Sequence, residues 1–213
     1  MLRDQSLVNC FGDRLTLATF CLVPIINASL CGACTGEEEA LELVRTKSPS
    51  LLFTTELLEQ GNGIDLIRES QKKASPPKCL IFLRRETPEL VEDALNAGAT
   101  GVIFISHLGY QGRGDFVLAL KAVLSGGIYV PTAVRDVLRG EEEEEIPQWV
   151  GEITVRELEV LQELAEGQSN VEIASSLNLS VPTVKTHLQS VYSKMGVNDR
   201  VKCLVAAVRA KIV

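Results

Sequence analysis

The side chains that most often carry acid–base, metal or nucleophilic chemistry are scarce in this chain. Its two histidines, His107 and His187, lie 80 positions apart. Among its six cysteines, Cys31-Gly-Ala-Cys34 has the spacing of a redox motif, but no second such pair completes a zinc site. We therefore expect neither an enzyme nor a metal or cofactor site. The thiol pair leaves a redox-sensing protein open as an alternative.

A different chemistry is indicated by residues 181–195, which have helical periodicity. One face is an apolar stripe at helical spacing, made of Val184, Leu188, Val191 and Met195. The opposite face carries short polar groups and a cation but no carboxylate: Pro182, Thr186, Gln189, Ser193 and, on its flank, Lys185. A solvated helix usually mixes charges of both signs. This face therefore favours contact with a polyanion.

The charge distribution points to the same segment. The chain has a net charge of −7, which on average disfavours nucleic acid. Residues 180–213, however, hold six lysines and arginines against one acid, Asp199. A polyanion would therefore bind toward the C-terminal end.

Five consecutive glutamates, residues 141–145, divide the chain. Like charges in a run repel one another and stay solvated, and Pro147 follows them. This pattern predicts an acidic linker at 140–150 between domains of residues 1–139 and 151–213. A dedicated acidic interaction segment is the alternative.

The first domain alternates short apolar runs with amphipathic segments. Strands are expected at 14–20, 28–34, 50–55, 79–83 and 100–105. Helices are expected at 37–46, 62–73, 88–97 and about 114–125. The alternation predicts βαβ units, and hence an α/β fold with a doubly wound parallel sheet covered by helices on both faces. Only the first two strands are too close together for a normal covering helix.

The second domain is expected to contain four helices and no strand. Thr154 with Glu157, and Ser169 with Glu172, have the capping-box spacing that begins the first two helices. A short second helix, a tight turn and the helix over 181–195 make a helix-turn-helix, whose second helix enters the DNA major groove. A small helical interaction domain is the alternative.

The whole second domain resembles the LuxR/NarL-type DNA-binding domain. The motifs T-x-R-E-x-E-V-L, G-x-S-N-x-E-I-A, T-V-K-T-H and K-x-G-V occur in order and at that family's spacing. The resemblance implies that the helix over 181–195 is the recognition helix. It implies base contacts from Lys185, Thr186 and Gln189. It also places three side chains near phosphates: Thr183, His187 and Lys194.

The fourth helix of this domain has two apolar faces. One face carries only small side chains: Cys203, Ala206, Ala207 and Ala210. Since a domain of this size can bury one face internally, the small face is predicted to be a dimer seam, and the resembling family also dimerises through this helix. Two-fold symmetry then predicts an inverted-repeat DNA site. Exposed alanines that merely favour the helix are the alternative.

The first domain resembles a response-regulator receiver, which has a flavodoxin/CheY-like fold. The resemblance rests on the strings GEEEALELVRTKSPSLLF, LVEDALNAGATGVIF and ALKAVLSGGIYVPTAV. A receiver needs an acidic pair after strand one for Mg²⁺ and an acceptor Asp after strand three. It also needs a hydroxyl after strand four and a Lys after strand five, because these groups hold the metal and the developing phosphoryl charge.

None of these receiver residues stands at the matching positions. Those positions are, in strand order, Thr19-Phe20, the region Thr54, Thr55 and Glu56, Leu83 or Arg84, and Ile105. The sequence therefore predicts a pseudo-receiver without phosphoryl chemistry. A permanent negative charge supplied by Glu56 is a further hypothesis.

Together these features predict a dimeric transcription regulator that binds double-stranded DNA. A regulatory protein or a ligand is expected to act on the receiver-like domain. Because no apolar run reaches about 18 residues and the N-terminus lacks a secretory signal, a cytoplasmic protein without membrane contact is expected. The alternatives are a thiol sensor acting through Cys31 and Cys34, or a protein–protein adaptor that does not bind DNA.

Overall fold

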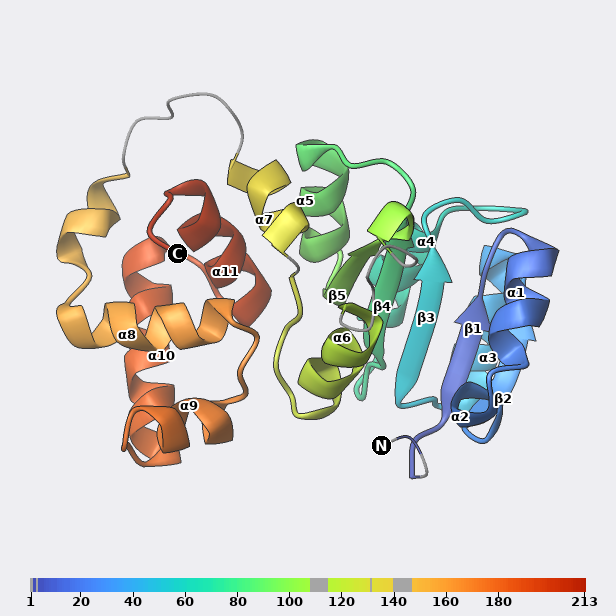
Figure 1. Ribbon diagram of the computed structural model, residues 1–213, viewed down its shortest axis with the longest axis horizontal. Coiled ribbons are helices and arrows are strands. Elements are labelled where there is room, and N and C mark those ends of the chain that lie inside the picture. The colour runs from blue at the N-terminus through green and yellow to red at the C-terminus, as the bar shows by residue number, and fades with distance from the viewer. Residues whose placement is uncertain (1, 3, 108–114, 131, 140–146) are drawn as a thin grey trace.

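The computed structural model describes residues 2, 4–107, 115–130, 132–139 and 147–213. Figure 1 shows an α/β part built around a sheet and, beside it, a smaller all-helical part. Within these ranges no helix is long and apolar enough to cross a membrane. Residues 140–146 of the predicted linker lie outside the described residues.

Five parallel strands form one sheet in the order β2-β1-β3-β4-β5. They are β1 Leu7–Cys10, β2 Leu30–Cys34, β3 Leu51–Thr55, β4 Lys78–Leu83 and β5 Ala99–Phe104. Strand β1 pairs with both β2 and β3. The predicted doubly wound parallel sheet is therefore confirmed, and the carboxyl ends of its strands meet at one edge.

Helices cover both faces of the sheet (Figure 1). Their bounds are α1 Arg14–Cys21, α2 Pro24–Asn27, α3 Glu37–Lys47, α4 Gly63–Ser70, α5 Pro88–Asn96, α6 Asp115–Leu124 and α7 Thr132–Arg139. Successive strand residues point to opposite faces. Leu51 and Phe53 join the apolar cluster that includes side chains of α1 and α6. Leu52 instead joins the larger cluster that includes α3, α4 and α5.

The predicted first strand over 14–20 is wrong, because these residues form α1 and the first strand is Leu7–Cys10. The side chain of Asp13 accepts a hydrogen bond from the Thr16 N–H at 2.8 Å and so begins the helix. No residue of α1 is buried, and Leu15 is 76% exposed. The apolar alternation in this segment therefore does not mark a buried strand face. The first strand ends at Cys10, and Phe11, Gly12 and Asp13 follow it instead of Thr19-Phe20.

The C-terminal part contains the four expected helices. They are α8 Val155–Ala165, α9 Asn170–Ser176, α10 Val181–Met195 and α11 Arg200–Arg209, preceded by the 3-10 helix η2 Gln148–Glu152. Both predicted capping boxes are present, at Thr154 with Glu157 and at Ser169 with Glu172. Helix η2 begins inside the segment that was predicted as linker.

The two parts are in contact through α11, which packs against α5 and α7 (Figure 1). Arg209 of α11 forms an ion pair with Glu92 of α5. A second ion pair joins Arg135 of α7 to Glu166 at the end of α8, with 3.0 Å between Nη1 and Oε1. These contacts fix the helical part against α5 and α7 of the α/β part.

Two glycines bring the backbones of the two parts together. A Cβ added at Gly127, just after α6, would lie 1.8 Å from the carbonyl oxygen of Gly167. A Cβ at Gly167, which has a φ of +81°, would lie 2.4 Å from the carbonyl oxygen of Ile128. No side chain fits between these backbones, so the contact requires glycine on both sides.

We expect Gly127→Ala to loosen this contact, because the added methyl group overlaps a backbone atom that cannot rotate away. Overpacking of this kind costs about 1–3 kcal/mol, which thermal denaturation would measure. Small-angle scattering should show a larger radius of gyration. Gly151→Ala is the matched control, since its Cβ would meet no atom within 4 Å. An unchanged midpoint and radius in the Gly127 variant would contradict this account of the contact.

Candidate nucleic-acid interface

Helices α9 and α10 form a helix-turn-helix. The turn between them contains Asn178, which has a φ of +52°. Helix α10 begins after Ser180, whose side chain accepts a hydrogen bond from the Thr183 N–H at 3.2 Å. Val184, Leu188 and Val191 of α10 are buried, as the predicted apolar stripe requires. One side of α10 is thus fixed to the domain interior, and the other is free to present polar groups.

The outer face of α10 is an open, shallow depression. It is lined by Lys185, Thr186, Gln189, Ser190, Ser193 and Lys194. Lys185 and Gln189 are exposed, and the Thr186 hydroxyl donates to the Pro182 carbonyl at 3.1 Å. The structure therefore brings together the three residues predicted to contact bases.

Thr183 and His187, predicted to lie near phosphates, do not line this depression. Thr183 is partly buried at the start of α10, where its hydroxyl is 2.7 Å from that of Ser180. His187 is partly buried as well. Ser190, which does line the depression, was not among the predicted contact residues, although helical spacing places it one position after Gln189.

Lys194 makes contacts within the helical domain besides the predicted phosphate contact. Its Nζ donates to Glu157 Oε2 at 2.6 Å and to the Glu152 carbonyl at 2.9 Å. Its side chain is 24% exposed, and that of Glu157 is 5% exposed. Lys194 thus ties the end of α10 to α8 while also lining the depression, and its contact with phosphate stays a prediction.

Glu157 of α8 contacts α10 through its carboxylate. Its carboxylate caps α8 through Thr154 and accepts from the Ser190 hydroxyl at 2.6 Å as well as from Lys194. Burial alone would raise the pKa of Glu157. The hydrogen bonds from Lys194, Ser190 and Thr154 outweigh that effect and lower the pKa to about 2. The angle between α8 and α10 therefore depends on an ionised Glu157.

The predicted dimer seam on α11 is wrong at two of its four residues. Cys203 and Ala207 are fully buried inside the helical domain, in a cluster with Leu161 and Val191. The larger face of α11 instead joins the apolar cluster that continues into the α/β part. Helix α11 thus has both faces covered within one chain, which sequence periodicity alone could not show. Ala206 and Ala210 are partly exposed.

The thiol pair is not arranged for disulfide exchange. Cys31 and Cys34 lie three residues apart on the extended strand β2, which separates their Cα atoms by about 10 Å, whereas a disulfide needs about 4–7 Å. Burial also raises the pKa of Cys31. The Cys31 thiol donates to the Leu7 carbonyl at 3.3 Å. These contacts give the pair a packing role.

The acceptor region lies at the carboxyl edge of the sheet. Thr55 ends β3, and its hydroxyl accepts from the Gly12 N–H at 3.1 Å and donates to the Leu57 carbonyl at 3.0 Å. Thr54 is fully buried. Glu56 is 2% exposed, and its Oε1 accepts from Arg85 Nε at 2.9 Å. The Arg85 guanidinium therefore balances the charge that Glu56 was hypothesised to display.

The remaining receiver positions are of mixed character: after β1, Phe11 and Gly12 are followed by the carboxylate of Asp13. Leu83 at the end of β4 is fully buried, and Arg84 after it is exposed. Ile105 follows β5 directly. Among the described residues, no group of three or more acidic, histidine or cysteine side chains is placed to hold a metal ion. The strand ends thus converge at one edge, as in a receiver, and bring Asp13, Thr55, Glu56, Arg84 and Ile105 together there.

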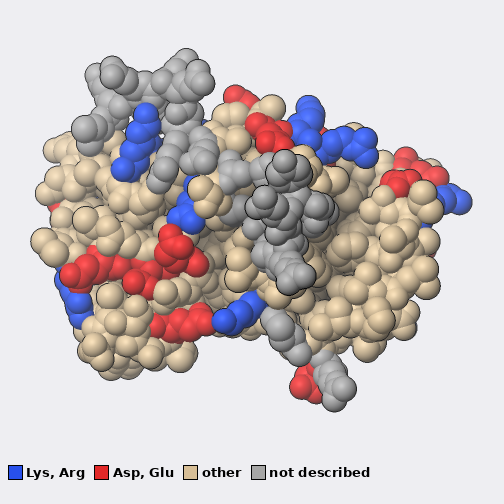
Figure 2. All heavy atoms as spheres, in the orientation of Figure 1, with Lys and Arg blue, Asp and Glu red and all other residues tan. Residues whose placement is uncertain are grey.

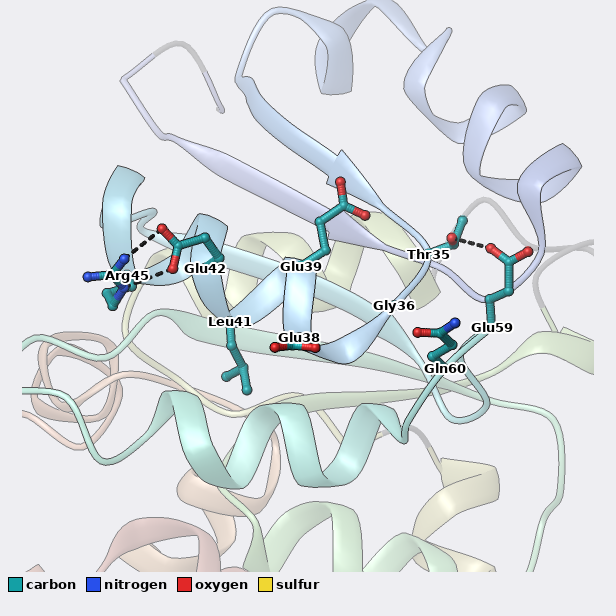
Figure 3. A pocket seen from close by; sticks show the side chains of 9 residues that line it. All are labelled: Thr35, Gly36, Glu38, Glu39, Leu41, Glu42, Arg45, Glu59 and Gln60. Carbon is teal, nitrogen blue, oxygen red and sulfur yellow. Dashed lines mark hydrogen bonds and ion pairs between the residues drawn. The ribbon is translucent and has the colours of Figure 1, made fainter.

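Another hollow, of about 740 Å³, lies beside α3. Figure 3 shows that acidic side chains dominate it, with Glu42 paired to Arg45 and Glu59 accepting from the Thr35 hydroxyl. A band of acidic side chains also crosses the face of the helical part over α8 (Figure 2). Both acidic surfaces repel phosphate, so the acid-free outer face of α10 is the better polyanion site.

Comparison with known proteins agrees with this architecture. Residues 152–207 match the family described as bacterial regulatory proteins, luxR family. The chain is 29% identical over 182 residues to the transcriptional regulatory protein LnrK of Bacillus subtilis, covering 81% of each chain. It is 28% identical over 173 residues to the probable transcriptional regulatory protein NarL of Mycobacterium tuberculosis, covering 81% of this chain and 78% of NarL.

The fold is also that of solved response regulators. RcsB of Salmonella typhimurium superposes with a TM-score of 0.55 at 19% identity, covering 95% of this chain and 97% of RcsB. The fold and the helix-turn-helix thus define a response-regulator architecture, a receiver-type domain followed by a LuxR-family domain. Residues 152–207 thus match the luxR family, and the relatives that match about four fifths of the chain are transcriptional regulatory proteins.

We expect the stability of the helical domain to depend on the charge of Glu157. A pKa lowered from 4.5 to about 2 corresponds to about 3 kcal/mol of stability at neutral pH. This stability is present above pH 4.5 and is lost as the pH falls toward 2, because the unfolded chain takes up the proton first. About 2 kcal/mol should be lost by pH 3.

Urea unfolding of the wild type and of Glu157→Gln at pH 7 and pH 3 would measure this effect. The variant should be less stable at pH 7 and should lose less stability on acidification. Glu159→Gln, which removes a surface carboxylate on the same helix, is the matched control. If Glu157→Gln shows the same loss between the two pH values as the wild type, the proposed role of this carboxylate is incorrect.

Proposed function

We propose that this chain is a dimeric, sequence-specific DNA-binding regulator whose receiver-like domain works without phosphorylation. The observation that carries the proposal is the outer face of α10. It is polar, free of carboxylates and exposed, while the inner face fixes the helix to its domain. A helix held in this way can enter the major groove with its side chains in a defined order.

In this proposal Lys185 and Gln189 read base edges, and Thr186 lies between them. A lysine suits the acceptor atoms of guanine, and a glutamine suits adenine. Thr183 and His187 lie nearer the sugar-phosphate backbone. The proposal has support from the fold relatives, among which is a structure of two RcsB dimers bound to two parallel DNAs.

Lys185→Ala and Gln189→Ala should each weaken binding to the specific site by about 1–3 kcal/mol, because each removes a contact to a base. Fluorescence anisotropy against a site selected from random DNA would measure this change, and the selected site should be an inverted repeat. Lys202→Ala is the matched control, since it removes the same charge from an exposed position on α11. If the selection enriches no DNA sequence, and if Lys185→Ala leaves the affinity for DNA unchanged, α10 does not contact the bases as proposed.

For the dimer, the receiver-like domain offers the better surface. Large apolar side chains are exposed on α1, α2 and α6 and just after α1: Leu15, Leu22, Ile25, Val117 and Leu118. Helices α1 and α6 cover the same face of the sheet, and their inner sides share one apolar cluster. Two copies that meet there would bury these side chains and leave both α10 helices free. A two-fold axis would give the inverted repeat.

Phosphorylation independence follows from the acceptor region. The Thr55 hydroxyl is engaged with two backbone groups, and a neutral hydroxyl needs a base to become a nucleophile. Ile105 supplies no cation for the developing charge. Control would then come from the amount of protein, from a partner that docks on the receiver-like domain, or from a ligand.

Incubation with Mg²⁺ and acetyl phosphate should leave the intact mass unchanged, because β3 ends in two threonines and the Glu56 carboxylate that follows is buried and paired with Arg85. DNA affinity and oligomeric state should not respond either. A receiver with a complete acidic site is the positive control. A donor-dependent gain of one phosphoryl group that is lost on changing Thr54, Thr55 or Glu56 would instead establish an ordinary phosphorylation switch.

A further inference from the structure

A cavity of about 290 Å³ lies at the carboxyl edge of the sheet, where a receiver would be phosphorylated. Its lining comes from the residues that follow β1, β3, β4 and β5. Doubly wound folds bind their ligands in this place, outside the carboxyl ends of the strands. The volume is close to the lower limit for small-molecule sites, which suits a molecule of one or two rings.

The walls of the cavity are mainly aromatic. Phe11, Phe20 and Phe82 line it together with Leu57 and Ile105. The three rings pack edge to face, with centroids 5.1 Å apart for Phe11 and Phe20, and 5.5 Å apart for Phe11 and Phe82. Aromatic walls of this kind favour a flat apolar molecule, whose ring can add to the same edge-to-face arrangement.

One polar group of the lining is incompletely satisfied. Glu56 is 2% exposed, and Arg85 occupies only its Oε1. Its Oε2 is buried and accepts no hydrogen bond from the described residues. A buried acceptor without a donor costs free energy, and a donor on a bound molecule would recover it once the carboxylate turns its Oε2, which is inaccessible here, toward the cavity.

The other charged groups of the lining give no excess of positive charge that would favour an anion. Asp13 stands at the mouth, and hydrogen bonds from the Thr16 hydroxyl and N–H lower its pKa, so it stays ionised. Two carboxylates, Asp13 and Glu56, line the cavity with the Arg84 guanidinium, and Arg85 pairs with Glu56, so that the four charges balance. An anion such as phosphate finds no lysine here, because Ile105 takes that position.

We propose that this cavity binds a small planar aromatic molecule that carries an amine, with its ring among the phenylalanines and its N–H groups directed at Glu56. The proposal rests on the proposed function in one respect, that no phosphoryl group enters this site. It deepens that function by naming the class of signal that the receiver-like domain accepts.

Three naphthalene probes of equal ring size test the proposal on the full chain by isothermal titration calorimetry at pH 7. They are 1-naphthylmethylamine, 1-naphthylmethanol and 1-naphthoate. The amine should bind at least about ten-fold more tightly than the naphthoate, because a hydrogen bond to a charged partner is worth that factor or more. Equal binding of amine and naphthoate, or binding of neither, would overturn the proposal.

Two variants locate the binding. Glu56→Gln should remove the preference for the amine over the alcohol and leave the binding of the ring. Glu59→Gln, a surface carboxylate that pairs with Arg14 outside the cavity, is the matched control and should keep the preference. Thr16→Trp, at an exposed position on the wall, should block all three probes. Full binding in Thr16→Trp would place the probes elsewhere and refute the assignment.

Measuring DNA binding with the same samples distinguishes failure of the ligand proposal from failure of the proposed DNA-binding function. Loss of probe binding with DNA binding intact refutes the cavity assignment alone. Probe binding with no DNA binding refutes the regulator and leaves the cavity. A donor-dependent mass gain refutes both, since it would show that the acceptor site is still in use.

Discussion

The arrangement of the whole chain depends on α11, which belongs to two apolar cores at once. Cys203 and Ala207 complete the interior of the helical domain, while Leu204, Val205 and Val208 join the cluster that continues into the receiver-like domain. The ion pair between Arg209 and Glu92 fixes the end of the helix. A helix with small residues on one side and larger ones on the other can approach both neighbours closely, and the two domains therefore share one continuous core.

Within the helical domain, polar contacts set the geometry that packing alone would leave open. Glu157 connects the first turn of α8 to Ser190 and Lys194 of α10. Arg200 of α11 connects to the start of α9 through Asn170 and the Gln168 carbonyl. Each contact crosses between helices that are distant in sequence. Together they hold the outer face of α10 at a fixed angle to a domain that is otherwise built from apolar stripes.

Local signals in the sequence predicted most of the fold. Capping boxes, helical stripes and four of the five strands were identified because short-range chemistry determines them. The first strand was missed because it has four residues and includes the buried Asn9, while the next segment alternates more regularly. The roles of Lys194 and Cys203 could not be predicted either. A partner across 37 residues or a second packing surface leaves no mark on local periodicity.

The contact between Gly127 and Gly167 limits how far the two halves are modular. With a Cβ excluded on either side, neither half offers a surface that tolerates an arbitrary neighbour. A chimera that joins this helical domain to another receiver needs a glycine at both positions to keep the same spacing. The glycine pair is thus a constraint on recombination. Exchange of either domain between regulators preserves the structure only where the new domain also has glycine at the contact.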